Sequence, residues 1–294
     1  MEAMIPEVRS FNRTVTERIG VLRDGFLDRG RPLGEARLLW EIGPDGAEVR
    51  ELRRRLGLDS GYVARMLSSL ERQGLVSRET SPSDGRVRRV RLTAPGAAER
   101  AELDRGSDEL AASVLEPLSD RQRVRLVAAM AEVERLLAAS MVRMNVEDPG
   151  SPEARWCLER YFGELDQRFD AGFDPALSIS ADRRELTPPA GALVVVRLRG
   201  APVGCGAIKL GPNGVCEVKR MWVAPDARGL GLGRRILLDL ERRAAEAGAR
   251  VLRLETNRSL EEAIALYRRS GYREVAPFNA EPYAHHWFEK RVSG

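Results

Sequence analysis

Apolar residues in the first half of the chain recur every three to four positions, which predicts a mostly helical region. Ile19, Leu22, Phe26 and Leu27 have this spacing in a first helix. Further helices are expected over 35–42, 49–56, from Asp59 or Ser60 to 73, 95–115 and 120–145. Between them, strand-like runs over 75–79 and 87–93 flank the turn-rich segment 81–85, which predicts a β-hairpin.

The pattern changes after residues 145–152, where two prolines, a glycine and acids favour a linker. Beyond it, strand-like and helical segments alternate, which favours an α/β or α+β unit. Strands are expected over 192–198, 203–210, 215–223, 250–255, 272–275 and 285–291, and helices over 156–169, 231–247 and 260–270.

Composition bears on the number of domains, the cellular compartment and the role of the cysteines. The 294 residues are enough for about two domains, and 43 % hydrophobic residues suffice for ordinary cores. No apolar run approaches the ~20 residues that span a bilayer, and the N-terminal residues lack a signal-peptide core, so we expect a cytoplasmic protein. Cys157, Cys205 and Cys216 form no CxxC pair, so neither a disulfide framework nor a zinc site is expected.

Charge is concentrated in the helical half of the chain. The whole chain carries a net charge of only +4, but residues 50–91 hold eleven arginines against five acids. Such a stretch is the electrostatic footprint of a phosphate-backbone binder, or alternatively an ordinary solvated basic face. The helices over 49–56 and 60–73, joined by a tight turn, predict a helix-turn-helix whose second helix enters the major groove. Its candidate base-reading residues are Ser60, Gly61, Tyr62, Arg65 and Ser69, and its buried face is expected to hold Val63, Met66, Leu67 and Leu70.

Several segments of this region resemble the MarR family of winged-helix regulators. They are 52–63, 70–76, Ser83-Asp84-Gly85-Arg86 and Leu92-Thr93-Ala94-Pro95-Gly96. The resemblance covers about residues 5–145 and implies a homodimer, formed by the first and last two helices, on a pseudo-palindromic double-stranded DNA operator. It also implies that Asp84 braces the wing and that Arg86 reaches DNA, with Arg88, Arg89 and Arg91 along the basic hairpin. The alternatives are that Arg53–Arg55 form a solvated face, that Tyr62 packs on the preceding helix, and that the winged helix only dimerises.

A glycine-rich loop follows the strand over 215–223 and opens a helix. Glycines at every second position allow close approach of the backbone to a ligand, and the amides at the helix start suit a pyrophosphate. The absence of Gly-Lys-Ser/Thr argues against an NTP-binding loop, and the spacing disfavours a dinucleotide fingerprint. The candidate binding residues are Met221, Trp222, Val223, Arg228, Gly229, Leu230, Gly231, Leu232, Gly233 and Arg234.

This loop resembles motif A of the GNAT acyltransferases, Arg/Gln-x-x-Gly-x-Gly/Ala after a strand. Residues 254–257, 263–267 and 270–272 resemble motif B, so the resemblance covers about residues 151–294. It implies acetyl-CoA as co-substrate, a small amine as acceptor, no metal, and a contact of Asn257 with pantetheine or CoA.

An amine must be neutral to attack a thioester, so a carboxylate is wanted as general base. Glu217 is the candidate base, because a spacing of six residues predicts that it shares a strand face with Val223. Tyr267, matching the motif-B tyrosine, is the candidate acid for the leaving thiolate, and backbone N–H groups near Met221–Val223 would stabilise the oxyanion. Alternatively, Glu217 pairs with Lys219 or Arg220, and Tyr267 is a packing residue.

Together these features predict a multi-domain protein. A mainly α, MarR-like winged helix-turn-helix domain over 1–146 is followed by an α/β GNAT acyltransferase domain over 147–294. The expected function is a regulator fused to an acetyl-CoA-dependent N-acetyltransferase. Two alternatives stay open: a regulator whose GNAT domain only senses acetyl-CoA, and a protein-modifying enzyme whose winged helix only dimerises or recruits a target.

Overall fold

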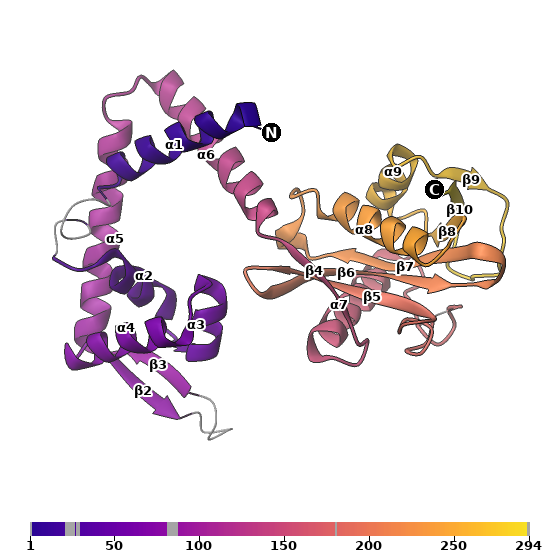
Figure 1. Ribbon diagram of the computed structural model, residues 1–294, viewed down its shortest axis with the longest axis horizontal. Helices are drawn as coiled ribbons and strands as arrows, with labels where there is room; N and C mark the ends of the chain where they lie inside the picture. The colour runs from indigo at the N-terminus through magenta and orange to yellow at the C-terminus, as the bar shows by residue number, and fades with distance from the viewer. Residues whose placement is uncertain (1, 21–26, 28–29, 81–87, 180, 293–294) are drawn as a thin grey trace. The chain divides into compact units, whose positions relative to one another are not determined.

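The computed structural model describes residues 2–20, 27, 30–80, 88–179 and 181–292 (Figure 1). The chain divides into two compact units, Met1–Ala131 and Glu132–Gly294, each with its own hydrophobic core. The boundary expected between residues 146 and 147 stays a prediction. No helix within the described ranges is long and apolar enough to cross a bilayer.

The N-terminal unit is a bundle of helices with a small sheet at one end. After a short 3₁₀ turn, Glu2–Met4, its helices are α1 (Ile5–Arg18), α2 (Leu33–Ile42), α3 (Val49–Leu56), α4 (Ser60–Arg72), α5 (Ala94–Leu115) and the start of α6 (Asp120–Ser140). The strands β1 (Ala47–Glu48), β2 (Val76–Thr80) and β3 (Arg88–Leu92) form an antiparallel sheet in the order β1-β3-β2. The predicted order of helices and hairpin is confirmed, and β1 is an additional strand.

The helix-turn-helix is built from local signals in the sequence. Gly57 ends α3 in the left-handed conformation, which a glycine adopts without a Cβ penalty. Asp59 then caps α4, because its side chain accepts a hydrogen bond from the Tyr62 amide at 2.8 Å. The buried face of α4 consists of Val63, Met66, Leu67 and Leu70, as predicted.

A close backbone contact fixes α5 against the hairpin. Thr93 caps α5 by accepting a hydrogen bond from the Gly96 amide, and its hydroxyl donates to the Gly74 carbonyl at 2.6 Å. A Cβ on Gly96 would lie 1.8 Å from the Leu75 oxygen. The glycine after Leu-Thr in this segment is therefore required by packing.

Two expectations for this unit fall largely on residues outside the described ranges. The first described α-helix is α1, Ile5–Arg18, and Leu22 and Phe26 of the expected first helix lie outside the described residues. The wing tip, with Asp84 and Arg86, also lies outside them, so their roles stay predictions.

The C-terminal unit is a seven-stranded sheet with helices on both faces (Figure 1). The strand order is β4-β5-β6-β7-β8-β10-β9, and only β7 and β8 run parallel. The elements are β4 (Arg143–Glu147), α7 (Pro152–Arg168), β5 (Gly191–Leu198), β6 (Ala201–Leu210), β7 (Val215–Val223), α8 (Leu232–Glu246), β8 (Val251–Thr256), α9 (Glu261–Arg269), β9 (Arg273–Val275) and β10 (His286–Arg291), with 3₁₀ turns at Pro212–Gly214 and Pro225–Ala227.

Alternation along β6 places the two long helices on opposite faces of the sheet. Cys205 lies on the face of α7, where the Cys157 thiol contacts the Gly204 carbonyl at 3.5 Å. A Cβ on Gly206 would meet Ile236 and Leu240 of α8, so this glycine lets α8 pack closely.

Part of the segment predicted as a linker is a strand instead. Helix α6 ends at Ser140 rather than near residue 145, and β4 pairs with β5 from Arg143↔Arg197 to Glu147↔Leu193. The helical prediction was wrong here because an edge strand with one exposed side shows weak alternation, so it did not stand out from the end of a polar helix.

A β-bulge interrupts β7 at the centre of the sheet. Lys219 pairs with Ala207 and Trp222 with Cys205, so three steps on β7 match two on β6. Arg220 takes up the extra residue with a φ of 54°. Pairing of β7 with the parallel strand β8 ends at Glu217↔Arg253, so the two strands diverge beyond this point.

Candidate active site

The glycine-rich loop presents unpaired amides at the start of α8. Gly229 and Gly231 have φ values of 82° and 70°, which lie in the left-handed region. Gly231 is the N-cap of α8 and provides no side chain to the helix, and the first intrahelical bond runs from the Arg235 amide to the Gly231 carbonyl at 3.2 Å. The amides before Arg235 are therefore available to an anion, and the helix dipole favours negative charge there.

Arg228, the first residue of the glycine motif, is held in place by α7. Its guanidinium contacts both Glu164 carboxylate oxygens at 2.7 and 2.6 Å, and its Nε donates to the Val223 carbonyl at 3.1 Å. Glu164 also accepts a hydrogen bond from the Trp222 indole at 2.8 Å. Burial alone would raise the pKa of Glu164, but the hydrogen bonds from Arg228 and Trp222 outweigh it and lower that pKa.

A large cleft and a small cavity meet between α7, α9 and the diverging strands. The cleft has a volume of about 830 Å³ and is lined by Arg228, Gly229, Gly231, Gly233 and Arg234. The cavity has a volume of about 110 Å³ and extends towards the loop after α7 and the loop before β10. Both are lined by Tyr161, Leu165, Met221, Leu260, Ala263 and Tyr267.

The backbone of β7 offers a polar group at this junction. The Ala224 amide donates to the Val203 carbonyl of β6, so alternation turns the Val223 amide away from β6 and towards the gap beside β8. Met221, Trp222 and Val223 all line the cleft. The predicted amides near Met221–Val223 thus lie where a ligand in the cleft would approach the small cavity.

A buried tyrosine, Tyr267, and a half-buried one, Tyr161, lie at the junction. The Tyr267 hydroxyl lies 3.9 Å from the Met221 sulfur, and burial together with the negative charge of Glu255 raises the pKa of Tyr267 above its ordinary value. Burial likewise raises the pKa of Tyr161, and the electrostatic interaction with the Tyr267 phenol raises it further. Both phenols are therefore neutral at physiological pH and are able to donate a proton.

Glu217, the predicted base, lies outside both cavities. Its carboxylate pairs with Lys219 at 3.0 Å, and Lys219 also pairs with Glu255. Burial alone would lower the pKa of Lys219, but the two carboxylates outweigh it and raise that pKa. The prediction that Glu217 and Val223 share a face is wrong, because the bulge shifts the alternation by one residue. Glu217 pairs with Lys209 and Val223 pairs with Gly204. These two partners are five positions apart on β6, so Glu217 and Val223 lie on opposite faces of the sheet.

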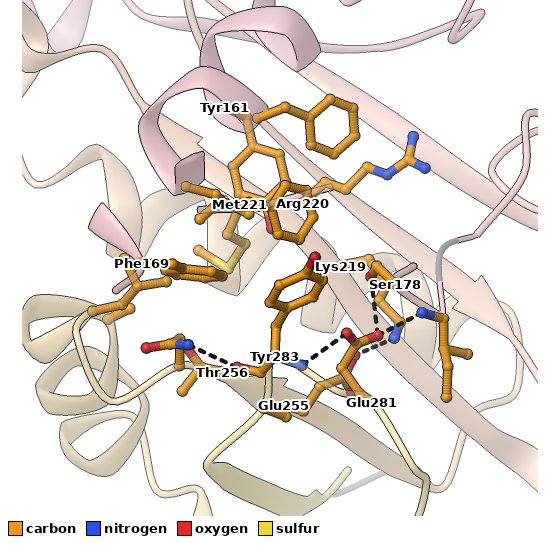
Figure 2. Close-up of a pocket in the computed structure, with 18 of the residues that line it drawn as sticks. Tyr161, Phe169, Ser178, Lys219, Arg220, Met221, Glu255, Thr256, Glu281 and Tyr283 are labelled. Carbon is orange, nitrogen blue, oxygen red and sulfur yellow. Dashed lines mark hydrogen bonds and ion pairs between the residues drawn. The ribbon is translucent and has the colours of Figure 1, made fainter. Parts of the chain in front are cut away.

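Of the two carboxylates that pair with Lys219, Glu255 lines the small cavity and Glu217 does not. Its side chain is 9 % exposed, and its Oε2 atom is buried without a hydrogen-bond partner, whereas Oε1 pairs with Lys219. Figure 2 shows Lys219 and Glu255 on one side of this cavity, with Met221 between Tyr161 and Tyr283.

Glu281 holds together the loops that enclose the small cavity (Figure 2), and Asn257 adds hydrogen bonds to the same loops. Glu281 accepts hydrogen bonds from the Ser178 hydroxyl at 2.9 Å and the Ile179 amide at 2.7 Å. Asn257, expected to contact CoA, instead donates to the Tyr283 carbonyl at 2.8 Å and accepts from Ser259. Because Asn257 lines the small cavity and not the cleft, its predicted contact with CoA is not supported by this placement.

The two histidines, His285 and His286, have local partners. The His286 ring lies 2.6 Å from Glu274, and the His285 amide donates to the Thr256 carbonyl. The three cysteines are buried in the core. In the described part of the chain, no three His, Cys, Asp or Glu side chains come together as metal ligands.

In the N-terminal unit, α4 exposes the predicted recognition residues. Ser60, Gly61, Tyr62 and Arg65 are exposed, while Ser69 is half-buried and accepts a hydrogen bond from Gln73 at 3.1 Å. The Arg65 guanidinium lies 5.8 Å from the Tyr62 ring centroid. Arg88 is exposed at the start of β3. Tyr62 is 40 % exposed, and its hydroxyl lies close to Gly34 of α2.

Known proteins match both halves of the chain. A model of the acetyltransferase (GNAT) family matches residues 154–272, and a model of the MarR family matches residues 29–87. A protein of Azospirillum brasilense named IAA acetyltransferase is 41 % identical over 127 residues, covering 43 % of this chain and 77 % of the relative. The chain belongs to the GNAT acetyltransferase family. Its N-terminal unit contains a MarR-family region, so the predicted fusion is confirmed.

Two further proteins are similar to part of the chain. An uncharacterised N-acetyltransferase of Schizosaccharomyces pombe is 33 % identical and covers 34 % of this chain and 62 % of the relative. The solved structure of a GNAT acetyltransferase from Elizabethkingia anophelis, with acetyl-CoA bound, is 16 % identical, covers 52 % of this chain and 99 % of that chain, and has a TM-score of 0.38.

Several residues of this GNAT site were missed from the sequence. Glu164 and Tyr161 lie three residues apart on α7, and so share one helical face that turns towards the cleft. Glu255 was also missed, although its position at the end of β8, twelve residues before Tyr267, was a usable signal. Burial of Lys219 between two carboxylates has no sequence signature.

Proposed function

We propose that the C-terminal unit transfers the acetyl group of acetyl-CoA to the amine of a small acceptor. The observation that carries this proposal is the junction of the cleft and the small cavity, which share Tyr161, Met221 and Tyr267. Acetyl-CoA fits the cleft, because the α8 amides and Arg234 suit its diphosphate and the volume of about 830 Å³ suits a long ligand. The acceptor then reaches the thioester from the opposite side.

The residues at the junction can support each part of the transfer. The Val223 amide polarises the thioester carbonyl while the amine nitrogen forms the C–N bond and the C–S bond breaks. Glu255 receives the proton that the nitrogen loses, and Tyr267 gives a proton to the departing thiolate. A proton returned from Glu255 to Tyr267 through solvent restores the site, so the products are an amide and the free thiol of CoA.

Paired variants test the two proton-transfer roles. Tyr267→Phe is expected to lower kcat by about 10²-fold or more with little change in acetyl-CoA affinity, as removal of a general acid does. Tyr272→Phe is the matched control, because Tyr272 is also a buried tyrosine but lines neither cavity. Glu255→Gln should lower turnover and Glu217→Gln should not, although both residues pair with Lys219.

The measurement is release of the CoA thiol across a panel of amines, with acetyl-CoA binding followed by calorimetry. Equal turnover of Tyr267→Phe and Tyr272→Phe would contradict the role of Tyr267. Acetyl-CoA binding without thiol release from any amine would instead support a domain that only senses the coenzyme.

We also propose that the N-terminal unit binds an operator in double-stranded DNA through α4 and the wing. The exposed face of α4, with Ser60, Gly61, Tyr62 and Arg65, supports this proposal. In a band-shift assay, Arg65→Ala should weaken operator binding, whereas the exposed Arg121→Ala on α6 should leave it unchanged. Equal binding by both variants would count against α4 as the recognition helix.

The homodimer expected of this unit is a proposal supported by exposed apolar side chains. On α1, Val8 and Phe11 are 57 % and 48 % exposed, and on α6, Val124 and Val127 are 71 % and 52 % exposed. Faces of this kind are seldom left in solvent, and a second copy of the chain is the occupant we expect. Val127→Glu should convert the dimer to a monomer in light scattering, and an unchanged mass would oppose this interface.

A further inference from the structure

The small cavity contains one carboxylate oxygen without a donor. Two acids line the cavity, and both Glu281 oxygens accept hydrogen bonds, from Ser178, Ile179 and Tyr283. Glu255 Oε1 pairs with Lys219, but Oε2 is buried without a partner. A buried carboxylate oxygen is costly to leave unsatisfied, so a ligand that donates a hydrogen bond at this point gains affinity.

Local cations do not satisfy this oxygen. Lys219 is shared between Glu217 and Glu255, so one ammonium serves two carboxylates. The guanidinium of Arg220 donates to the Ala181 carbonyl at 2.5 Å and lies 5.5 Å from the Phe162 ring centroid. The charge balance around Glu255 therefore favours a ligand nitrogen that donates a hydrogen bond and carries positive charge before it reacts.

The walls of the cavity are formed by a cluster of aromatic rings. Phe162 and Phe173 stack with centroids 5.8 Å apart, and Phe173 lies 4.8 Å from Tyr283. The Asp174 amide donates to the Tyr283 hydroxyl oxygen at 2.9 Å, which fixes this ring. Figure 2 shows Tyr161, Phe169 and Tyr283 arranged around Met221. Flat, fixed rings of this kind favour a flat apolar ligand, and their faces also attract a cation.

The size of the cavity limits the ligand further. Its volume is about 110 Å³, whereas an apolar protein cavity of about 150 Å³ holds one benzene molecule. A polyamine, an aminoglycoside or a peptide side chain with its backbone is too long or too polar for this space. By this comparison one aromatic ring already fills the cavity, so the short arm that carries the amine must extend to the junction with the cleft, beside Tyr161, Met221 and Tyr267.

We propose that the acceptor is an arylalkylamine: a primary amine, joined by a short chain to one aromatic ring, whose nitrogen donates to Glu255 Oε2. The ring then lies among Phe162, Phe169, Phe173 and Tyr283, and the nitrogen faces the thioester beside Met221. This inference rests on the proposed acetyl transfer and adds the chemical class of the acceptor.

The experiment compares 2-phenylethylamine with hexylamine and spermidine on the full chain, by calorimetry in the presence of CoA and by thiol release with acetyl-CoA. The aromatic amine is expected to bind at least tenfold more tightly than either other amine and to have the highest kcat/KM. Glu255→Gln should weaken its binding about tenfold, while the control Glu274→Gln, on β9 and outside the cavity, should not. Phe173→Leu should lower the preference for the aromatic amine over hexylamine, and unchanged acetyl-CoA binding shows that the variant is folded.

The possible failures are distinguishable. Equal or tighter binding of hexylamine or spermidine, with thiol release, overturns the aromatic class and leaves acetyl transfer standing. Tight binding of 2-phenylethylamine without thiol release from any amine supports the binding site and rejects the proposed reaction. No binding of 2-phenylethylamine in the presence of CoA overturns the inference directly.

Discussion

Replacement of Gly231 by alanine tests whether the loop before α8 holds the diphosphate of acetyl-CoA. Gly231 has a φ of 70°, and an added Cβ would meet no atom within 4 Å, so the methyl group causes no clash in the protein itself. The left-handed conformation costs an alanine about 1 kcal/mol relative to glycine. For a unit of this size, that corresponds to a fall in Tm of about 2–4 °C.

The loss of affinity has a separate physical origin. A phosphate oxygen bound to the α8 amides lies about 2.9 Å from each nitrogen, which leaves little room for a methyl group at Gly231. Loss of one charge-assisted hydrogen bond costs about 1.5–3 kcal/mol, so the Kd for acetyl-CoA should rise about 10- to 100-fold.

Gly248→Ala is the matched control. Gly248 has a φ of 83°, its added Cβ also meets no atom within 4 Å, and it follows the opposite end of α8. Calorimetry with acetyl-CoA and thermal unfolding should show similar losses of stability in both variants and a loss of affinity in Gly231→Ala alone. If the two variants bind acetyl-CoA equally well, the diphosphate does not lie on this loop, and the reasoning from its glycines is refuted.

Three further predictions follow from the contacts described. Gly96→Ala should destabilise the N-terminal unit by about 3 kcal/mol in thermal unfolding, because its Cβ would lie 1.8 Å from the Leu75 oxygen, while Gly74→Ala, whose Cβ meets nothing within 4 Å, should cost much less. Asp59→Ala removes the cap of α4 and should cost about 1 kcal/mol, and an unchanged Tm would show that the hydrogen bond to Tyr62 adds nothing. Burial and the charge of Glu255 raise the pKa of Tyr267, so this group adds stability that is fully present below the ordinary tyrosine pKa of about 10 and is lost as pH rises through the folded value. Tm measured from pH 8 to 11 should therefore decline above about pH 10. The decline of Tm should be less steep in Tyr267→Phe than in the unsubstituted protein. Below that pH, kcat should show no loss from ionisation of the phenol.

The order of elements was predictable because its signals are local. Glycine at Gly57 and Gly74, the cap at Asp59 and the spacing of Val63, Met66, Leu67 and Leu70 mark the helix-turn-helix without reference to the rest of the chain. The strand, glycine loop and helix around Gly231 were predictable for the same reason. Each of these features depends on residues that are neighbours in sequence.

The errors concern long-range relations. The face of Glu217 was inferred from strict alternation, but Lys219 and Trp222 pair with positions two apart on β6, and only the partner strand reveals that bulge. The hydrogen bond from the Asn257 amide to the Tyr283 carbonyl, twenty-six residues further on, was likewise invisible to local pattern, and the contact of Asn257 with the coenzyme stays a prediction. Glu164 is bound to Arg228 across sixty-four positions, a distance at which no sequence periodicity is informative.

One face of α7 has a consequence for the order in which ligands bind. Tyr161 lines the small cavity proposed for the acceptor, and Glu164, one turn later, binds Arg228 of the loop proposed for the coenzyme. If the proposed sites are right, one helical turn of α7 is linked to both, so binding of each ligand is expected to favour binding of the other. Both substrates would then bind before reaction, and initial-rate plots would intersect rather than run parallel.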